Sequence, residues 1–163
     1  MRASVALAGA AAVAMLLQTT VFPTVPGLPI VPDVVLVLAI YVAVRRQSTG
    51  GAVAAFLLGY FLDTFSGTLL GLNAFSLTAA YLAVQWLARH LWVERGLPVV
   101  GVVLFGGVVR ETAAVAVAAF VAARPPVWQH ALGYGLAGVL VSALVAPAVF
   151  AAVAWEERLL GLA

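Results

Sequence analysis

Long apolar stretches alternate with short polar breaks along the whole chain. The apolar runs cover about residues 4–22, 30–46, 50–66, 71–89, 97–121 and 130–154. Most are long enough to cross a hydrocarbon core of about 30 Å at a helical rise of about 1.5 Å per residue. The pattern therefore predicts an all-α fold, a polytopic membrane bundle of six transmembrane helices, with residues 1–163 as a single transmembrane domain.

The polar breaks carry a charge pattern, because arginine falls at every second one. In a six-helix arrangement, six arginines lie on one side of the membrane: Arg2, Arg45, Arg46, Arg89, Arg95 and Arg158. Arg124 lies on the other side, and Arg110 lies within a run. Short cytoplasmic loops of membrane proteins are enriched in arginine. We therefore expect a multi-pass membrane protein with both termini in the cytoplasm.

Composition excludes several classes of protein. The chain is 65% hydrophobic and only 9% charged, whereas a soluble domain carries about 25% charged residues. It has no cysteine, which excludes a disulfide framework, a thiol nucleophile and a thiolate metal site. The positive charge rests on a few arginines that can face anionic lipid, so it does not indicate nucleic acid as a partner. We expect no cofactor and no bound metal.

Two segments allow alternative topologies. The second and third runs are short, since about twelve apolar residues separate Asp33 from Arg45 and Gly51 from Asp63. A re-entrant hairpin would bury two arginines at about 2.5–3.5 kcal/mol each, so two short spans are favoured, with Asp33 at the outer interface. The first run follows Arg2 and resembles a signal peptide. A retained helix is favoured, because cleavage would place the two termini on opposite sides.

Prolines recur at every third position in the first outer loop, over residues 23–32. This period matches the polyproline II helix, so the loop reads as a stiff spacer. A docking motif for an SH3-like cytoplasmic domain is the alternative, but the predicted topology puts the loop outside.

Small residues recur at every fourth position along the third run. The series is Gly51, Ala55, Gly59, Asp63, Gly67 and Gly71, interrupted only by the acid. Such faces let neighbouring helices approach closely, and internal packing is favoured over an interface with another protein. Because a spacing of four drifts by about 40° per step, the strip should wind around the helix and serve more than one neighbour. Ala6, Ala10 and Ala14 form a similar face on the first helix, where docking of a partner is also open.

Charged residues within the apolar runs form a candidate site. Arg110 and Glu111 lie about thirteen residues into the fifth run, and Asp63 lies about as deep when counted from the same side. Gln18 on the first helix reaches a similar level. Charges at this depth need partners, so we predict a buried polar cluster of Asp63 and Arg110 with Gln18 or Glu111 nearby. Its role is either to fix the register of the helices or to serve function.

Signatures of enzymes are mostly absent, and we expect no catalytic residues. His90 and His130 fall on opposite sides of the predicted membrane, so they cannot act together as base and acid. Asp33 and Asp63 both lie toward the outside, and such a pair is compatible with an aspartyl dyad like that of lipoprotein signal peptidase. The asparagine-containing motif of that family around its second acid is missing here.

One segment resembles the MreD family of bacterial rod shape-determining proteins. The similarity lies in the Pro32-Asp33 opening of the second run, followed by Gly51, and in the Gly59-x₃-Asp63-x₃-Gly67-x₃-Gly71-Leu series. It covers roughly residues 32–85, and the length and hydropathy of the chain agree. The pair Arg110-Glu111 does not map onto a motif of the family.

The resemblance implies a non-enzymatic membrane scaffold of the cell-elongation complex, which makes peptidoglycan. Such a subunit would bind MreC and help connect MreB filaments to RodA and its transpeptidase partner. MreD proteins are thought to be similar in fold to the substrate-binding subunits of energy-coupling-factor vitamin transporters, and a subunit of that kind is the alternative. Its loops would offer few polar groups for a ligand, although a selective pocket needs several.

Overall fold

The computed structural model describes five helices and short flanking segments. The described residues are Gly9, 31–45, 48–66, 69–90, 97–122 and 135–159. The helices are α2 (Val34–Arg45), α3 (Thr49–Ser66), α4 (Leu72–Ala88), α5 (Leu97–Ala122) and α7 (Leu136–Leu159). Within these ranges the protein is all-helical, as predicted. Five residues of the predicted sites lie outside the described residues: Ala6, Ala10, Ala14, Gln18 and Gly67.

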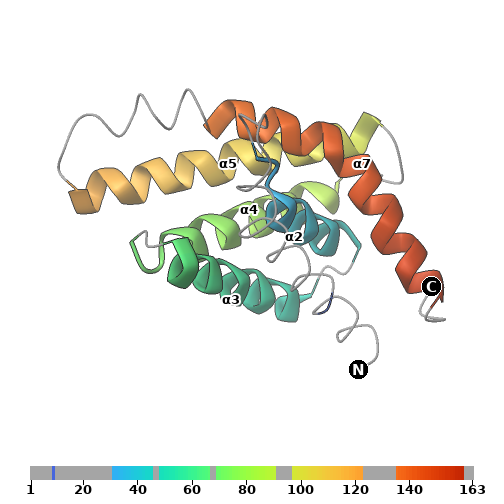
Figure 1. Cartoon of the computed structure of the whole chain (residues 1–163), viewed down its shortest axis with the longest axis horizontal. Helices are drawn as coiled ribbons and strands as arrows, with labels where there is room; N and C mark the ends of the chain where they lie inside the picture. Colours follow the sequence, from blue (N-terminus) through green and yellow to red (C-terminus); the bar gives the residue numbers. More distant parts are fainter. Residues whose placement is uncertain are drawn as a thin grey trace.

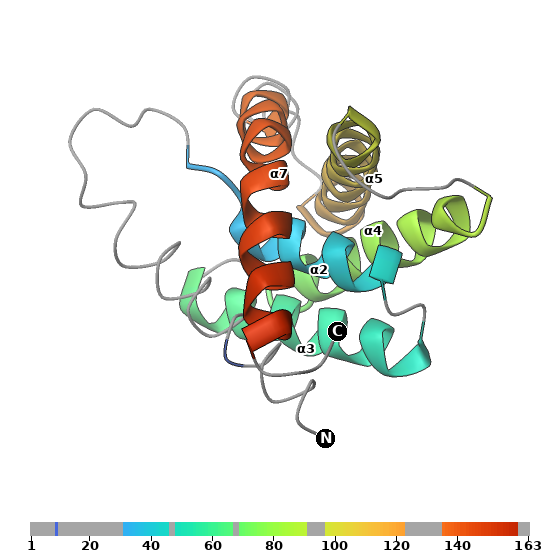
Figure 2. The same ribbon diagram turned by 90° about the vertical axis from the view of Figure 1, so that its right-hand side faces the viewer.

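Four helices form a curved row around the fifth. Helix α3 contacts α4, α4 contacts α5, and α5 contacts α7, while α2 contacts all four of them. Figures 1 and 2 show α2 in the middle of this arrangement, with α3 on one side and α5 and α7 on the other. The row runs in chain order, so consecutive helices are neighbours and their connections can be short.

Helix α2 is central because its sequence is apolar on every side. The segment reads Val-Val-Leu-Val-Leu-Ala-Ile-Tyr-Val-Ala-Val-Arg, and Val35 to Tyr41 and Ala43 are all buried. A helix that is hydrophobic all round belongs in the interior of a bundle. Its twelve residues give a length of only about 18 Å. This shortness sets the level at which Asp33, just before its first turn, meets the other helices.

The helices differ in their capacity to cross a bilayer. Two are long and apolar enough by composition, over Pro98–Val121 and Leu136–Leu159. Three shorter apolar helices cover Val34–Arg45, Thr49–Phe65 and Leu72–Ala88. These lengths are consistent with a helical membrane bundle. Six spans stay a prediction, because only five helices are described.

The last helix ends later than the apolar pattern predicts. The predicted span stops at residue 154, but α7 continues through Trp155, two glutamates and Arg158 to Leu159. The prediction was wrong here because a hydropathy run stops at the last apolar residue, whereas a helix can continue into a charged, solvated turn. Glu157 stabilises this last turn, since its Oε2 accepts a hydrogen bond of 2.8 Å from the hydroxyl of Tyr41 on α2.

Helix α7 is bent near its middle, where Pro147 lies inside the helix. Figure 2 shows the first half almost end-on and the second half running across the bundle. Proline removes a backbone donor and clashes with the preceding turn, so it is the usual cause of such a bend. The bend brings Phe150 edge-on to the ring of Tyr41, with centroids 5.0 Å apart. The second half of α7 therefore covers α2.

The small-residue series on α3 packs inside the bundle, against α4. A Cβ atom at Gly51 would overlap the hydroxyl oxygen of Tyr81, and one at Gly59 would lie 2.5 Å from the Cα of Ala74. Ala55, between them, is 2% exposed. The expectation that the strip serves more than one neighbour is not met by these two glycines. Gly51 faces the long side chain of Tyr81, and Gly59 faces the backbone of Ala74. Both of these residues belong to α4, so the two glycines pack against the same helix.

Gly59→Ala is expected to lower the free energy of unfolding by about 1–3 kcal/mol. The added methyl group would meet backbone atoms of α4, with Cβ 2.5 Å from the carbonyl oxygen of Asn73, and backbone cannot rotate away. Thermal unfolding in detergent, followed by tryptophan fluorescence, measures the loss. Gly101→Ala is the matched control, because nothing lies within 4 Å of a Cβ there. Equal stability of the two variants would contradict the close approach of α3 and α4.

Candidate functional site

Asp33 closes the start of α2 and ties it to α7. The backbone N–H of Leu36 donates a hydrogen bond of 2.9 Å to Oδ1 of Asp33, which is the geometry of an N-cap aspartate. The backbone N–H of Asp33 donates to Oγ of Ser142 at 2.7 Å. That hydroxyl donates to the carbonyl oxygen of Gly138, also at 2.7 Å. The first turn of the central helix is thus fixed against the first half of α7.

The guanidinium of Arg110, on α5, lies between Asp33 and Asn73. Its Nη1 donates to Oδ2 of Asp33 in an ion pair, and its Nη2 donates to Oδ1 of Asn73 at 3.0 Å. The side chains of Arg110 and Asp33 are 15% and 13% exposed, so the protein encloses most of both. An enclosed charge is costly unless it is paired and hydrogen-bonded. Each member of this pair therefore depends on the other.

Asp63, near the end of α3, caps the neighbouring helix α4. Its Oδ2 accepts hydrogen bonds from the backbone N–H groups of Gly71 at 2.9 Å and Ala74 at 3.2 Å. Its Oδ1 accepts from the backbone N–H of Asn73 at 2.9 Å. The first N–H groups of a helix have no partner within it, and its dipole favours negative charge there. Gly71 precedes α4 with φ at 95° and has no side chain, so Asp63 supplies the cap.

Asn73 joins these two sites into one network. Its Nδ2 donates to Oδ1 of Asp63 at 2.9 Å, while its Oδ1 accepts from Arg110. The chain of contacts runs from Ser142 on α7 through Asp33, Arg110 and Asn73 to Asp63 on α3. We call it the Asp33–Asp63 network. It connects all five described helices at one level of the bundle.

The network differs from the predicted cluster in the partner of Arg110. The sequence analysis placed Asp63 beside Arg110, but the structure gives the ion pair to Asp33 and links Asp63 through Asn73. The physical reason is the shortness of α2. Twelve residues above Arg45, or about 18 Å, Asp33 lies at the level of Arg110 rather than beyond it. Gln18, the other predicted neighbour, lies outside the described residues.

Sequence reasoning missed Asn73 and Ser142. Both are polar residues in otherwise apolar runs, which is a signal in itself, because polar groups within membrane helices seek partners. Asn73 also lies two residues beyond the predicted helix start at residue 71, where the backbone N–H groups of the first turn need acceptors. If every polar residue of the apolar runs is assigned a partner, Asn73 and Ser142 enter the predicted cluster.

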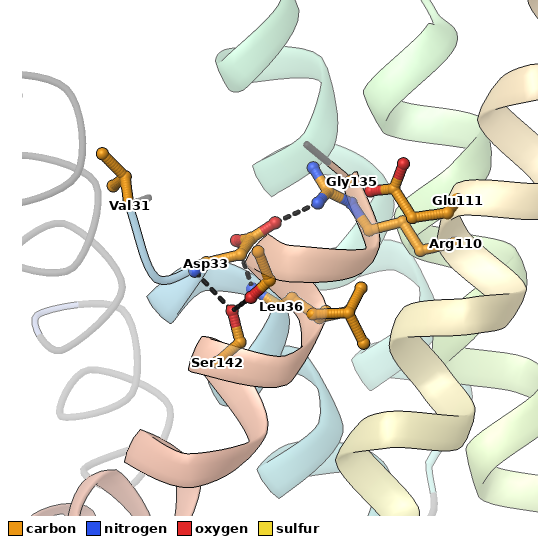
Figure 3. A pocket seen from close by; sticks show the side chains of 9 residues that line it. Val31, Asp33, Leu36, Arg110, Glu111, Gly135 and Ser142 are labelled. Carbon is orange, nitrogen blue, oxygen red and sulfur yellow. Dashed lines mark hydrogen bonds and ion pairs between the residues drawn. The ribbon is translucent and has the colours of Figure 1, made fainter. Parts of the chain in front are cut away.

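Glu111 diverges from its neighbour Arg110 and faces a pocket. The pocket has a volume of about 210 Å³ and lies between the start of α2, the middle of α5 and the first half of α7. Figure 3 shows Arg110 directed toward Asp33 and the carboxylate of Glu111 beside Gly135. A Cβ atom at Gly135 would lie 2.5 Å from Oε2 of Glu111. The absence of a side chain at residue 135 therefore leaves room for this carboxylate.

A profile of the family described as rod shape-determining protein MreD matches residues 3–146. The match covers most of the 163 residues and includes every member of the Asp33–Asp63 network. The chain belongs to the MreD family. No curated protein and no solved structure matches the chain significantly. The suspected resemblance is thereby confirmed, while the expected similarity to energy-coupling-factor subunits has no support among solved structures.

Membership in the MreD family makes this a rod shape-determining membrane protein. MreD is a shape-determining structural family rather than a known enzyme family. The geometry of the two aspartates agrees with structural roles. Asp33 is held by Arg110 and the first turn of α2, and Asp63 by the first turn of α4. A dyad requires two carboxylates that share a proton, whereas each of these has its own set of donors.

Proposed function

We propose that this MreD protein is a non-enzymatic scaffold of the bacterial cell-elongation complex. It lies in the inner membrane, crosses it several times and keeps both termini in the cytoplasm. It binds MreC and helps connect MreB filaments to RodA and its transpeptidase partner during peptidoglycan synthesis. The match to the MreD family over residues 3–146 carries this proposal.

The Asp33–Asp63 network supports a scaffold role. Its hydrogen bonds join helices: a cap on α2, a cap on α4 and an ion pair from α5. Hydrogen-bond networks of this kind in a low-dielectric interior rigidify a structure. A bundle fixed at one level in this way presents constant outer faces to partners, as a scaffold needs.

Affinity purification of the protein in mild detergent from its native host tests the proposal. We expect MreC to co-purify, and we expect the triple change of Ala6, Ala10 and Ala14 to leucine to reduce its recovery at least several-fold. The reason is that bulky side chains prevent the close helix approach that small residues allow. Ala151→Leu is the matched control, because Ala151 is an exposed small residue of α7.

The possible results separate the proposed function from its alternative. Recovery of MreC with the wild-type protein supports the scaffold. Recovery of ATPase and coupling subunits without MreC would overturn it in favour of a substrate-binding subunit of a vitamin transporter. Equal recovery of MreC by the leucine triple variant and by Ala151→Leu would show that Ala6, Ala10 and Ala14 do not form the docking face.

A further inference from the structure

The pocket beside Glu111 is partly open and has the carboxylate of Glu111 on its wall. Arg110 is the cation on its wall; its two Nη atoms are engaged by Asp33 and Asn73, while its buried Nε has no partner among the described residues. Glu111 has no hydrogen-bond donor among the residues that the structure describes. Among the described residues that line the pocket, Asp33 carries −1, Arg110 +1 and Glu111 −1, so their formal charges sum to −1. The pocket therefore favours a cationic group and disfavours an anion.

The volume limits the size of the occupant. A pocket of about 210 Å³ is smaller than the roughly 300–1,000 Å³ of sites for drug-sized ligands. It is much larger than the roughly 30 Å³ that one water molecule occupies in the liquid. A group of several heavy atoms fits this range. Leu36 and Val139 supply apolar wall for a short carbon chain.

The acceptors favour an ammonium group over a metal ion. Two carboxylates reach the pocket, those of Asp33 and Glu111, and the first is paired with Arg110. Within the described residues, no group of three or more His, Cys, Asp or Glu side chains gathers in a way that suits a metal, and hard divalent ions take about six or more oxygen ligands. An ammonium group instead needs one acceptor for each N–H bond. Ser142 also lines the pocket, and its hydroxyl oxygen has two lone pairs, one of which accepts the hydrogen bond from the backbone N–H of Asp33.

We propose that this pocket binds the protonated primary amine of a small organic cation, with Glu111 as its counter-ion. The amine can belong to a soluble molecule or to the ethanolamine headgroup of a phospholipid, since both present the same –CH₂–NH₃⁺ group. The proposal does not depend on MreC or on the elongation complex. It concerns a site between α2, α5 and α7 and predicts selective binding to the purified protein.

The first test uses n-propylammonium chloride as the probe on the purified full-length protein in detergent. We expect it to raise the unfolding temperature by about 2–4 °C relative to equal sodium chloride, as ligands that bind only the folded state do. The neutral isostere n-propanol and tetramethylammonium, which has no N–H donor, should give no such rise. Glu111→Gln should abolish the rise, while Glu156→Gln, an acid outside the pocket, should keep it. No rise in the wild type, or an equal rise in Glu111→Gln, would overturn the proposal.

A second measurement keeps the test valid if Glu111→Gln does not fold. Dicyclohexylcarbodiimide labels carboxyl groups in apolar surroundings, and mass spectrometry of the wild-type protein locates the label. We expect n-propylammonium to slow labelling of Glu111 at least several-fold more than labelling of Glu156 in the same sample, because consumption of the carbodiimide by the amine affects both carboxyl groups, and we expect n-propanol to leave both unchanged. Labelling at the same rate with and without the amine would overturn the proposal.

Lipid nanodiscs distinguish the two sources of the amine. Native mass spectrometry after mixing with phosphatidylethanolamine or phosphatidylcholine reports which lipid stays bound. Retention of phosphatidylethanolamine by the wild type and by Glu156→Gln, but not by Glu111→Gln, would assign the site to the headgroup. Binding of n-propylammonium without retention of either lipid would assign it to a soluble amine.

Discussion

Arg110→Ala is expected to lower the free energy of unfolding by about 3–5 kcal/mol, the usual cost of leaving one member of an enclosed ion pair without its partner. The change removes the ion pair with Asp33 and the hydrogen bond to Asn73 together. Both partners then stay enclosed at the junction of α2, α4 and α5. Thermal and urea unfolding of the purified protein in detergent, followed by tryptophan fluorescence, measure the loss.

Two further variants make this prediction specific to the pair. Arg45→Ala removes an exposed arginine at the end of α2 and should change stability by less than about 0.5 kcal/mol. Arg110→Met combined with Asp33→Asn removes both charges and keeps an oxygen to cap α2. We expect the double variant to be more stable than Arg110→Met alone, because contacting residues are not additive. If Arg110→Ala unfolds like Arg45→Ala, the ion pair does not stabilise the bundle.

Asp63→Ala is expected to cost about 3–5 kcal/mol, since it leaves several donors of one helix terminus without an acceptor at about 1–3 kcal/mol each before relaxation. Asp63 is 1% exposed, so water replaces the lost acceptor poorly. The orphaned donors are the backbone N–H groups of Gly71, Asn73 and Ala74 and the side-chain amide of Asn73. The same unfolding measurement applies.

Controls at neighbouring positions separate capping from general disturbance of α3. Thr64→Ala changes the adjacent, exposed residue, whose hydroxyl only donates to the carbonyl oxygen of Phe61, and should be nearly neutral. Asp63→Asn keeps one acceptor oxygen and should fall between the wild type and Asp63→Ala. A result in which Asp63→Ala and Thr64→Ala are equally stable would show that α4 does not need this cap.

The positions of the helices were largely predictable, because an apolar segment that lies in lipid or in the protein interior must satisfy its own backbone hydrogen bonds and so forms a helix. The runs at 50–66, 71–89 and 97–121 differ from α3, α4 and α5 by one residue at each end at most. Apolar runs and helices differ at the start of α2 and at the end of α7. Helix α2 begins four residues after its run, because Pro32 and Asp33 precede the first turn. Helix α7 continues five residues past its run, through a charged turn.

The sequence predicted two members of the network, Asp63 and Arg110, but not how they are connected. Counting residues from one side correctly brought Asp63 and Arg110 to one level, since both lie about 20 Å from the start of their helices. The same count places Asp33 there too, once α2 is known to start at Val34. The sequence alone predicted Asp33 at the outer interface, at the end of a short span. Which side chains then pair depends on rotation of each helix about its axis, which small differences in apolar pattern do not determine.

The pocket could not be predicted from the sequence. It arises because Gly135 and Gly138 on α7 and Glu111 on α5 meet beside the start of α2, and no local pattern indicates that three distant segments leave a space. The pair Arg110-Glu111 gave a partial signal. Adjacent residues on a helix point about 100° apart, so two charges placed side by side in an apolar run must serve different neighbours.

The central position of α2 has a consequence for the order in which the chain matures. Helix α2 is covered by α4, α5 and α7, all of which are synthesised after it. Roughly ninety residues separate its end from the start of α7, and translation at about 5–20 residues per second needs about 5–20 s to make them. Asp33 has no Arg110 to neutralise it until α5 is made, because Arg110 follows the end of α2 by 65 residues. We therefore expect the membrane insertion machinery to stay in contact with α2 until α7 has been synthesised and packs against it.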